Sequence, residues 1–265
     1  MSSSPALEFA SALDVGRARS NNEDAIALDP QARLAVLADG MGGYNAGEVA
    51  SEMATRIISQ GLGRWLQNLG TPPSESVLHE AVEDWGRHAN RAIFESARDV
   101  KEHHGMGSTV VVAAFTGDLL VVGHVGDSRA YRLRQGQLER LTRDHSLLQE
   151  QLDGGLITQE QALTSTHRNL VTRALGMDEQ VEVETRSHEM RSGDILLMCS
   201  DGVYDLLDDQ EMARLIGQSD TLDAGCKALV EAANDAGGKD NISVVLVRVG
   251  AEPGKRKVSW WPFKR

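Results

Sequence analysis

Apolar residues recur along the chain with two different periods, and the changes of period predict the order of its elements. Between residues 46 and 66 they recur every three or four positions, which is typical of a helix with one buried face. The same spacing returns over 77–93, after the breaker Thr71-Pro72-Pro73, so we expect an antiparallel helix pair. Two further helices are expected near 208–217 and 221–234.

Short apolar runs separated by turn residues predict strands elsewhere in the chain. These runs cover 34–38, then 108–115, 119–125 and 129–134, which we expect to form a meander, and then 181–185, 194–200 and 241–249. Because strands, helices and strands follow one another without βαβ alternation, we predict an α+β fold with mostly antiparallel sheets covered by helices. Residues 144–176 are polar, with short helical pieces, and are expected to form a surface flap.

Composition and charge narrow the class of protein. The 265 residues suffice for one large domain, and 41% hydrophobic and 25% charged residues are ordinary for a globular protein. A net charge of -12 argues against nucleic-acid binding, which needs a basic surface. Two cysteines cannot form a disulfide framework. We find no signal peptide and no stretch that could span a bilayer, so we expect a cytoplasmic protein.

Acidic residues stand at the ends of several predicted strands. Apolar runs lead into Asp39-Gly40, Gly126-Asp127 and Asp201-Gly202, and Asp240 precedes the last strand. One Asp-Gly pair usually marks only a turn. Several at the ends of core strands can bring carboxylates together, where they would repel one another. Bound hard cations, Mg²⁺ or Mn²⁺, would relieve that repulsion.

The polar segment 16–24 adds candidate chemistry before the first predicted strand. It contains Arg17 and Arg19 as well as Glu23 and Asp24. An arginine beside a pair of metal ions can bind phosphate oxygens with its planar guanidinium group. A solvated loop is the alternative for this segment.

Eight motifs in order closely resemble those of the bacterial PPM (type 2C) protein phosphatases. They are GRARSNNEDA (16–25), VLADGMGGYNAGEVAS (36–51), GMGSTVVVA (105–113), GHVGDSRAYRLR (123–134), LTRDHS (141–146), HRNLVTRALG (167–176), LLMCSDGVYDLL (196–207) and GGKDNISVVLV (237–247). The resemblance covers about 10–250 and leaves 251–265 as a separate tail. It implies a four-layer α-β-β-α sandwich, in which two antiparallel sheets pack face to face between antiparallel helix pairs.

The resemblance also implies roles for individual residues around two Mn²⁺ or Mg²⁺ ions. The expected metal-binding set is Asp39, which bridges both ions, the Gly40 carbonyl, Asp201, Asp240, Glu23 directly or through a water, and Asp127, which shares a third, weaker site with Asp201. Arg19 is expected to bind the phosphate, and Asp24 and Asn241 to support the ligands.

The implied reaction is hydrolysis of phosphoserine and phosphothreonine by a water or hydroxide shared by the two metals, without a phosphoenzyme. The chain has no Cys-x5-Arg loop, since Asp205 and Ala232 stand six residues after Cys199 and Cys226. Met41 stands where eukaryotic relatives carry a histidine. The leaving-group proton is therefore expected from a metal-bound water, and neither His124 nor His145 is assigned that role.

Two other functions remain open on the same fold. One is a catalytically silent module that binds phosphoproteins, and the other is a two-metal phosphatase for small molecules. We expect an active monomer that reverses the action of a partner serine/threonine kinase. The tail segment 255–265 has five cations and no acid, which suits an acidic partner or an anionic membrane surface, or a frayed terminus.

Overall fold

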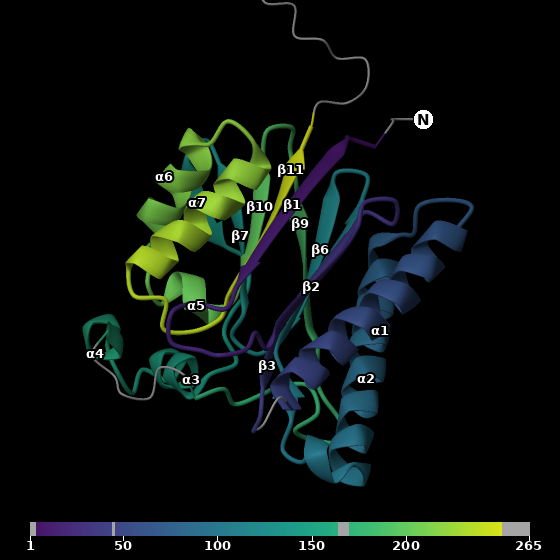
Figure 1. Ribbon diagram of the computed structural model, residues 1–265. Helices are drawn as coiled ribbons and strands as arrows, with labels where there is room; N and C mark the ends of the chain where they lie inside the picture. Colours follow the sequence, from purple (N-terminus) through teal and green to yellow (C-terminus); the bar gives the residue numbers. More distant parts are fainter. Residues whose placement is uncertain (1–3, 44–45, 164–169, 251–265) are drawn as a thin grey trace, which may run out of the picture.

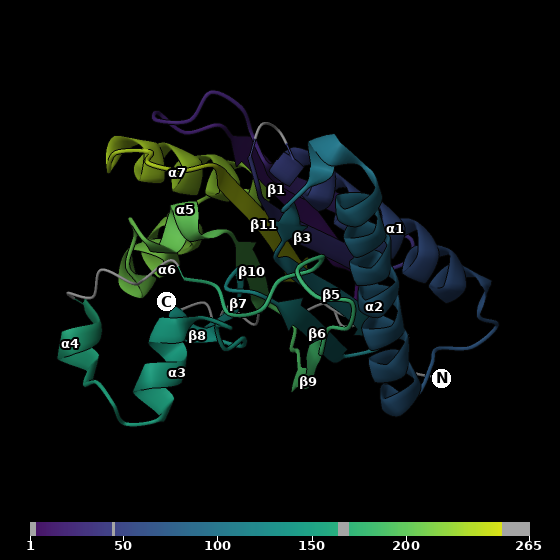
Figure 2. The ribbon, with the colours of Figure 1, turned by 90° about the horizontal axis from the view of Figure 1, so that it is seen from below.

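Two antiparallel β-sheets lie face to face at the centre of the computed structural model, and helices cover the outer face of each (Figure 1). The view from below shows α1 and α2 on one side and α6 and α7 on the other (Figure 2). The predicted four-layer α-β-β-α sandwich is confirmed. The structure describes residues 4–43, 46–163 and 170–250, so the tail (251–265) and residues 164–169 of the predicted flap lie outside the described residues.

The first sheet has the strand order β1-β11-β10-β7-β8. Its strands are β1 (Leu7–Asp14), β7 (Arg129–Arg134), β8 (Gln137–Arg140), β10 (Ile195–Cys199) and β11 (Ile242–Val249). Every neighbouring pair is antiparallel, with Leu197 opposite both Tyr131 and Leu246.

The second sheet has the strand order β2-β3-β5-β6-β9, with β4 paired to the end of β3. Its strands are β2 (Asp24–Asp29), β3 (Leu34–Met41), β4 (Gly107–Ser108), β5 (Val110–Thr116), β6 (Leu119–Val125) and β9 (Glu184–Glu189). The register places Asp24 directly opposite Asp39, and His124 opposite Glu184.

Long helices flank the sheets, and short ones lie at the end of the sandwich. They are α1 (Ala46–Asn68), α2 (Glu75–Asp99), the 3₁₀ turn η1 (Lys101–His103), α3 (Leu147–Asp153), α4 (Gln159–Leu163), α5 (Asp201–Tyr204), α6 (Asp209–Gln218) and α7 (Leu222–Asp235). Within the described ranges, no helix has the length and apolar character needed to cross a bilayer.

The central strands are apolar on both faces because each face is covered. In β3, Val36 packs into the core under α1 and α2, whereas its neighbour Leu37 packs between the two sheets. In β10, Leu197 faces the core under α6 and α7, and Met198 faces the other sheet. Side chains alternate across a strand, so a strand buried on both faces is an unbroken apolar run. Full burial of one such side chain stabilises the fold by about 1.5–3 kcal/mol.

The strands that the apolar pattern missed or misplaced are edge strands. The sequence did not predict β1, β2 and β8, and β9 begins at Glu184 rather than at Val181. These four strands form the edges of the two sheets. An edge strand is incompletely covered, so its sequence mixes apolar and polar residues and lacks the run that marks a central strand.

Candidate metal centre

Four aspartates from both sheets meet at one end of the sandwich. Asp39 lies near the end of β3 and Asp127 follows β6, whereas Asp201 follows β10 and Asp240 precedes β11. Burial raises the pKa of Asp39 well above its usual range, and the carboxylates of Asp24, Asp201, Asp127 and Asp240 raise it further. The fold thus gathers the four strand-end acids singled out from the sequence.

The pKa values of these aspartates show that burying their carboxylates close together disfavours the charged forms. Asp24 and Asp127 are buried, and burial raises the pKa of each to about 6. The pKa of Asp201 is also raised well above its usual range, first by burial and then by Asp127. Asp39 and Asp201 keep part of their surface exposed, so the group opens to solvent. A bound cation would offset the repulsion and reach the acids from that side.

Hydroxyl groups of the neighbouring strand fix the backbone at Asp39. The Asp39 N–H donates to Thr109 Oγ1 at 3.0 Å, and the Thr109 N–H donates back to the Asp39 carbonyl at 2.8 Å. The Ser108 hydroxyl also donates to the Asp39 carbonyl, at 3.0 Å. The main chain that carries Asp39 is therefore held by two side chains and one main-chain group.

The turn that carries Asp127 is tied to the same place. Thr109 Oγ1 and Ser128 Oγ are 2.7 Å apart in a buried hydrogen bond, which joins the Asp39 and Asp127 segments. Gly126 has φ +100°, a conformation that strongly favours glycine. The Tyr204 hydroxyl donates to the Asp127 carbonyl at 3.0 Å. The segment before β5 and helix α5 thus both contact the Asp127 turn.

Arg129 connects this turn to the segment that follows β8. Its guanidinium group donates to both carboxylate oxygens of Asp144, at 2.6 Å for the closest contact. The same group lies 3.5 Å from the centre of the Tyr204 ring, a cation–π contact. A planar, two-point ion pair of this kind fixes direction as well as distance.

Asn241 attaches the N-terminal loop to the first sheet. Its side-chain amide donates to the carbonyls of Val15 and Asn21, and its Oδ1 accepts from the Glu23 N–H at 2.8 Å. Asn241 therefore positions Glu23, although it follows Asp240 on a distant part of the chain. Burial, the largest effect, raises the pKa of Glu23.

Gly40 lies where three segments approach closely. Its N–H donates to the Glu23 carbonyl at 3.0 Å. A Cβ atom at this position would lie 2.0 Å from the Gly47 carbonyl oxygen at the start of α1 and 2.6 Å from that of Glu23. Only glycine lets β3, α1 and the N-terminal loop meet at this point.

Arg19 is the arginine that reaches the acids. Its Nη2 donates to Asp240 Oδ2 at 2.8 Å, and about half of its side chain is exposed. The pKa of Arg19 is raised, first by the bond to Asp240. Arg17 instead uses its main-chain N–H to contact the Gly238 carbonyl. Of the two arginines in this segment, Arg19 is therefore the one that pairs with a predicted metal-binding acid. It is also the one that the family resemblance implies as the phosphate-binding residue.

The donor atoms fit hard divalent cations. They are carboxylate oxygens, and Asp24 Oδ1 is buried without a hydrogen-bond partner among the described residues. No three of the described aspartates and glutamates at this centre have oxygens within 4.8 Å of one another. The described group that meets this limit is His124, His145 and Glu184.

Several supporting residues were not predicted from the sequence. They are Ser108, Thr109, Ser128 and Ser200, whose hydroxyl donates to Asp24 Oδ2 at 2.9 Å. Two of them adjoin a predicted acid, since Ser128 follows Asp127 and Ser200 precedes Asp201. A small hydroxyl residue beside a strand-end acid is the signal that could have found them.

Comparisons with known proteins identify the family of the chain. A family model described as protein phosphatase 2C matches residues 16–240. The serine/threonine phosphatase stp of Listeria monocytogenes is 36% identical over 237 residues, which cover 88% of this chain and 92% of that protein.

Solved structures are similar over almost the whole chain. The Mycobacterium tuberculosis serine/threonine phosphatase PstP/Ppp superimposes with a TM-score of 0.82 at 36% identity, covering 92% of this chain and 99% of that one. The catalytic domain of the serine/threonine protein phosphatase PstP in complex with two manganese ions gives a TM-score of 0.79 at 35% identity, with the same coverage.

Proposed function

The chain belongs to the protein phosphatase 2C family, and from this membership we propose how its own residues perform the reaction. It is a metal-dependent serine/threonine protein phosphatase, so its substrates are phosphoproteins. One observation carries the proposal: Asp39, Asp127, Asp201 and Asp240 come from two different sheets and meet at one end of the sandwich.

We infer that the centre holds two Mn²⁺ or Mg²⁺ ions and a third, weaker one. Asp39 would be a ligand of both principal ions, and Asp127 and Asp201 would hold the third. The other proposed metal-binding groups are the Gly40 carbonyl, Asp240 and Glu23. Oxygen-only donors and the raised pKa values of the buried acids support this assignment.

Bound ions supply an activated water for in-line attack on phosphorus and neutralise charge on the phosphoryl oxygens. Arg19 sits at the exposed side of the acids, where its guanidinium group can exchange Asp240 for phosphate oxygens. Met41, beside Gly40, has no proton to donate, so the departing serine or threonine oxygen takes its proton from water.

The biological setting belongs to the same proposal. We propose a monomeric cytoplasmic enzyme that opposes a serine/threonine kinase and acts on the proteins which that kinase phosphorylates. The basic and aromatic segment 255–265 is proposed to contact an acidic partner or an anionic membrane surface.

The proposal is tested by phosphate release from a panel of phosphoserine and phosphothreonine peptides, with Mn²⁺ and with excess chelator. We expect Asp201→Asn to lower the Mn²⁺-stimulated rate by about 100-fold or more, because loss of a proposed ligand should cost at least as much as loss of a residue that only supports a ligand. The variant should stay folded because asparagine has nearly the same shape. A phosphoprotein-binding module without activity would bind these peptides and release no phosphate.

An exposed acid on α7 provides the matched control. Asp223→Asn removes the same charge at an exposed position in the first turn of α7. It should keep the wild-type rate. Full activity of Asp201→Asn, or of the wild type in chelator, would refute the proposed mechanism. A related variant, Arg19→Ala, should mainly raise KM for the phosphopeptide.

A further inference from the structure

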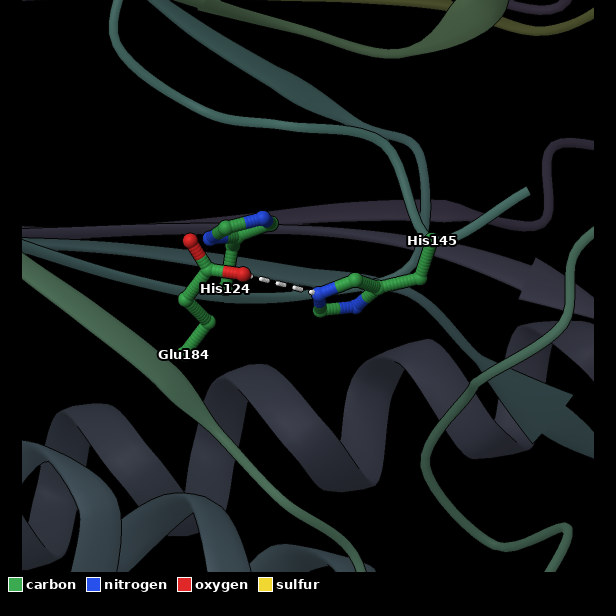
Figure 3. A group of neighbouring side chains, drawn as sticks. All are labelled: His124, His145 and Glu184. Carbon is green, nitrogen blue, oxygen red and sulfur yellow. Dashed lines mark hydrogen bonds and ion pairs between the residues drawn. The ribbon is translucent and has the colours of Figure 1, made fainter. Parts of the chain in front are cut away.

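Figure 3 shows a compact group of two histidines and a glutamate. One of them, His145, bonds Gly126 in the turn that precedes Asp127. His124 is in β6, Glu184 begins β9 as its register partner, and His145 comes from the segment between β8 and α3. The two rings stack, with centroids 4.7 Å apart and planes 14° from parallel. Both histidines are buried.

Hydrogen bonds assign the proton on each ring. The Gly126 N–H donates to His145 Nδ1 at 3.1 Å, so Nδ1 carries a lone pair and Nε2 carries the proton. Two groups lie 3.4 Å from His145 Nε2: Glu184 Oε2 can accept its proton, whereas the Arg173 guanidinium group can only donate and therefore makes no hydrogen bond there. His124 Nε2 donates to the Arg143 carbonyl at 2.7 Å. Burial, together with His124 and Arg173, lowers the pKa of His145 to about 4, so the ring is neutral near pH 7.

The same bonds argue against a cation in this group. An ion on His145 Nε2 would displace its proton to Nδ1, where the Gly126 N–H already points. The Arg173 guanidinium group also lies 3.4 Å from Nε2 and would repel an ion there. Each ring instead forms hydrogen bonds with neighbouring groups of the protein.

His145 holds the turn before Asp127 at two points. Its ring accepts from the Gly126 N–H, and its own main-chain N–H donates to the Gly126 carbonyl at 2.9 Å. Asp144, the residue before His145, forms its two-point ion pair with Arg129, which lies two residues after Asp127. The position of Asp127 therefore depends on the segment that contains Asp144 and His145.

We propose that His145 is a positioning residue for Asp127: its ring, oriented by Glu184, fixes Gly126 and thereby sets the affinity of the ion that Asp127 holds. The inference rests on the proposed function for the identity of that ion. It concerns the protein's own hydrogen bonds, which exist without any ion.

The first test uses the metal-free full chain. In the ¹⁵N-labelled, chelator-treated protein, a scalar coupling across the hydrogen bond should join the Gly126 amide nitrogen to His145 Nδ1. The ¹⁵N shifts should show His145 Nδ1 without a proton and Nε2 with one. A protonated Nδ1, or the absence of the coupling, would overturn the proposal whatever the protein's activity.

The second test compares two substitutions of His145. Asparagine places an amide oxygen near the position of Nδ1 and can still accept from Gly126, whereas glutamine reaches the position of Nε2 and leaves the Gly126 N–H unpaired. In a Mn²⁺ titration followed by the electron paramagnetic resonance of free Mn²⁺, His145→Gln should weaken the weaker class of sites by about 10-fold or more. The tighter class should change little, and His145→Asn should stay near wild type.

His188→Gln is the matched control, since it changes another histidine, in β9, that does not contact Gly126. It should leave both classes of sites unchanged. Equal weakening of both classes in both His145 variants would mean a general structural role and overturn the proposal. Stoichiometric Zn²⁺ that is kept by wild type and lost in Glu184→Gln would also overturn it. Absence of phosphatase activity in every protein would refute the proposed function, while the Mn²⁺ titration would still report on His145.

Discussion

The carboxylate of Asp39 is held in an environment that opposes its charge. Burial and four other aspartates raise its pKa, and the register places Asp24 directly opposite it in the neighbouring strand. Two unit charges at about 4 Å interact by roughly 4 kcal/mol at an effective dielectric constant of 20. The metal-free protein therefore keeps this residue at a cost to its stability.

Asp39→Asn should raise the stability of the metal-free protein and abolish its activity. Removing the charge relieves the repulsion, so we expect the metal-free variant to unfold at a higher temperature than the wild type. Each 1 kcal/mol gained raises the midpoint by about 2–4 °C in a protein of this size. Mn²⁺ should no longer raise the midpoint as it does in the wild type, and turnover should be lost. Thermal unfolding by circular dichroism, with and without chelator, measures both effects; an unchanged or lower midpoint in chelator would contradict the electrostatic account.

Metal binding should depend on pH through the raised acids. Asp24 and Asp127, with pKa values of about 6, hold protons in the folded metal-free protein below that pH. An ion must displace those protons, so Mn²⁺ affinity should fall as the pH is lowered from 7 to 5. Calorimetric titrations near pH 6 in buffers of different ionisation enthalpy should show proton release. Binding without proton release would mean that the acids are already ionised.

The folded-state pKa values also fix the sign of the stability change. For a carboxyl group whose folded pKa is raised, the folded state holds more protons than the unfolded state between about pH 4 and pH 6. These acids therefore lower the stability of the metal-free protein as the pH rises through that window. Asp39→Asn should reduce this loss.

At the scale of elements, hydroxyl groups add to the main-chain pairing where the end of β3 meets the start of β5. Thr109 accepts from the Asp39 N–H and bonds Ser128, so it connects three segments of the centre. Thr109→Val keeps the shape and leaves the buried polar partners unpaired. We expect a loss of about 1–3 kcal/mol in the free energy of unfolding.

Thr109→Ser is the matched variant, since it keeps the hydroxyl and loses a methyl group worth about 0.8 kcal/mol. Urea unfolding in chelator should rank the valine variant below the serine variant, and the valine variant should also bind Mn²⁺ more weakly. A serine variant as unstable as the valine variant would show that packing, not the hydroxyl, holds these strands together.

The elements that the sequence predicted well are those whose surroundings are uniform. Examples are the central strands β3 and β10 and the helices α1 and α2. Along each of them a given face keeps the same surroundings, so the spacing of apolar residues shows directly which faces are buried. The edge strand β1 pairs with a strand that lies far along the chain, β11. Local spacing carries little information about such a neighbour.

At the scale of the whole molecule, the acids could be named from the sequence because each stands beside a recognisable strand end. The residues that hold these acids in place could not be named from the sequence. The contact of Asn241 with Glu23 and that of His145 with Gly126 join segments that only the packing of two sheets brings together. The resemblance to a known family supplied the roles of the acids, and the geometry supplied what holds them in place.

The centre also joins the two sheets, because Asp39 belongs to one and Asp201 and Asp240 adjoin the other. Ions that bind only the folded protein stabilise it by about 2.7 kcal/mol per site at a concentration 100 times Kd. Since the ligands come from both sheets, opening either sheet would lose the ions. Mn²⁺ should therefore slow hydrogen exchange of the most protected amides in β3 and in β11 by the same factor. Asp201→Asn should remove much of that gain from both strands, and protection confined to one sheet would show that the ions do not bridge the sandwich.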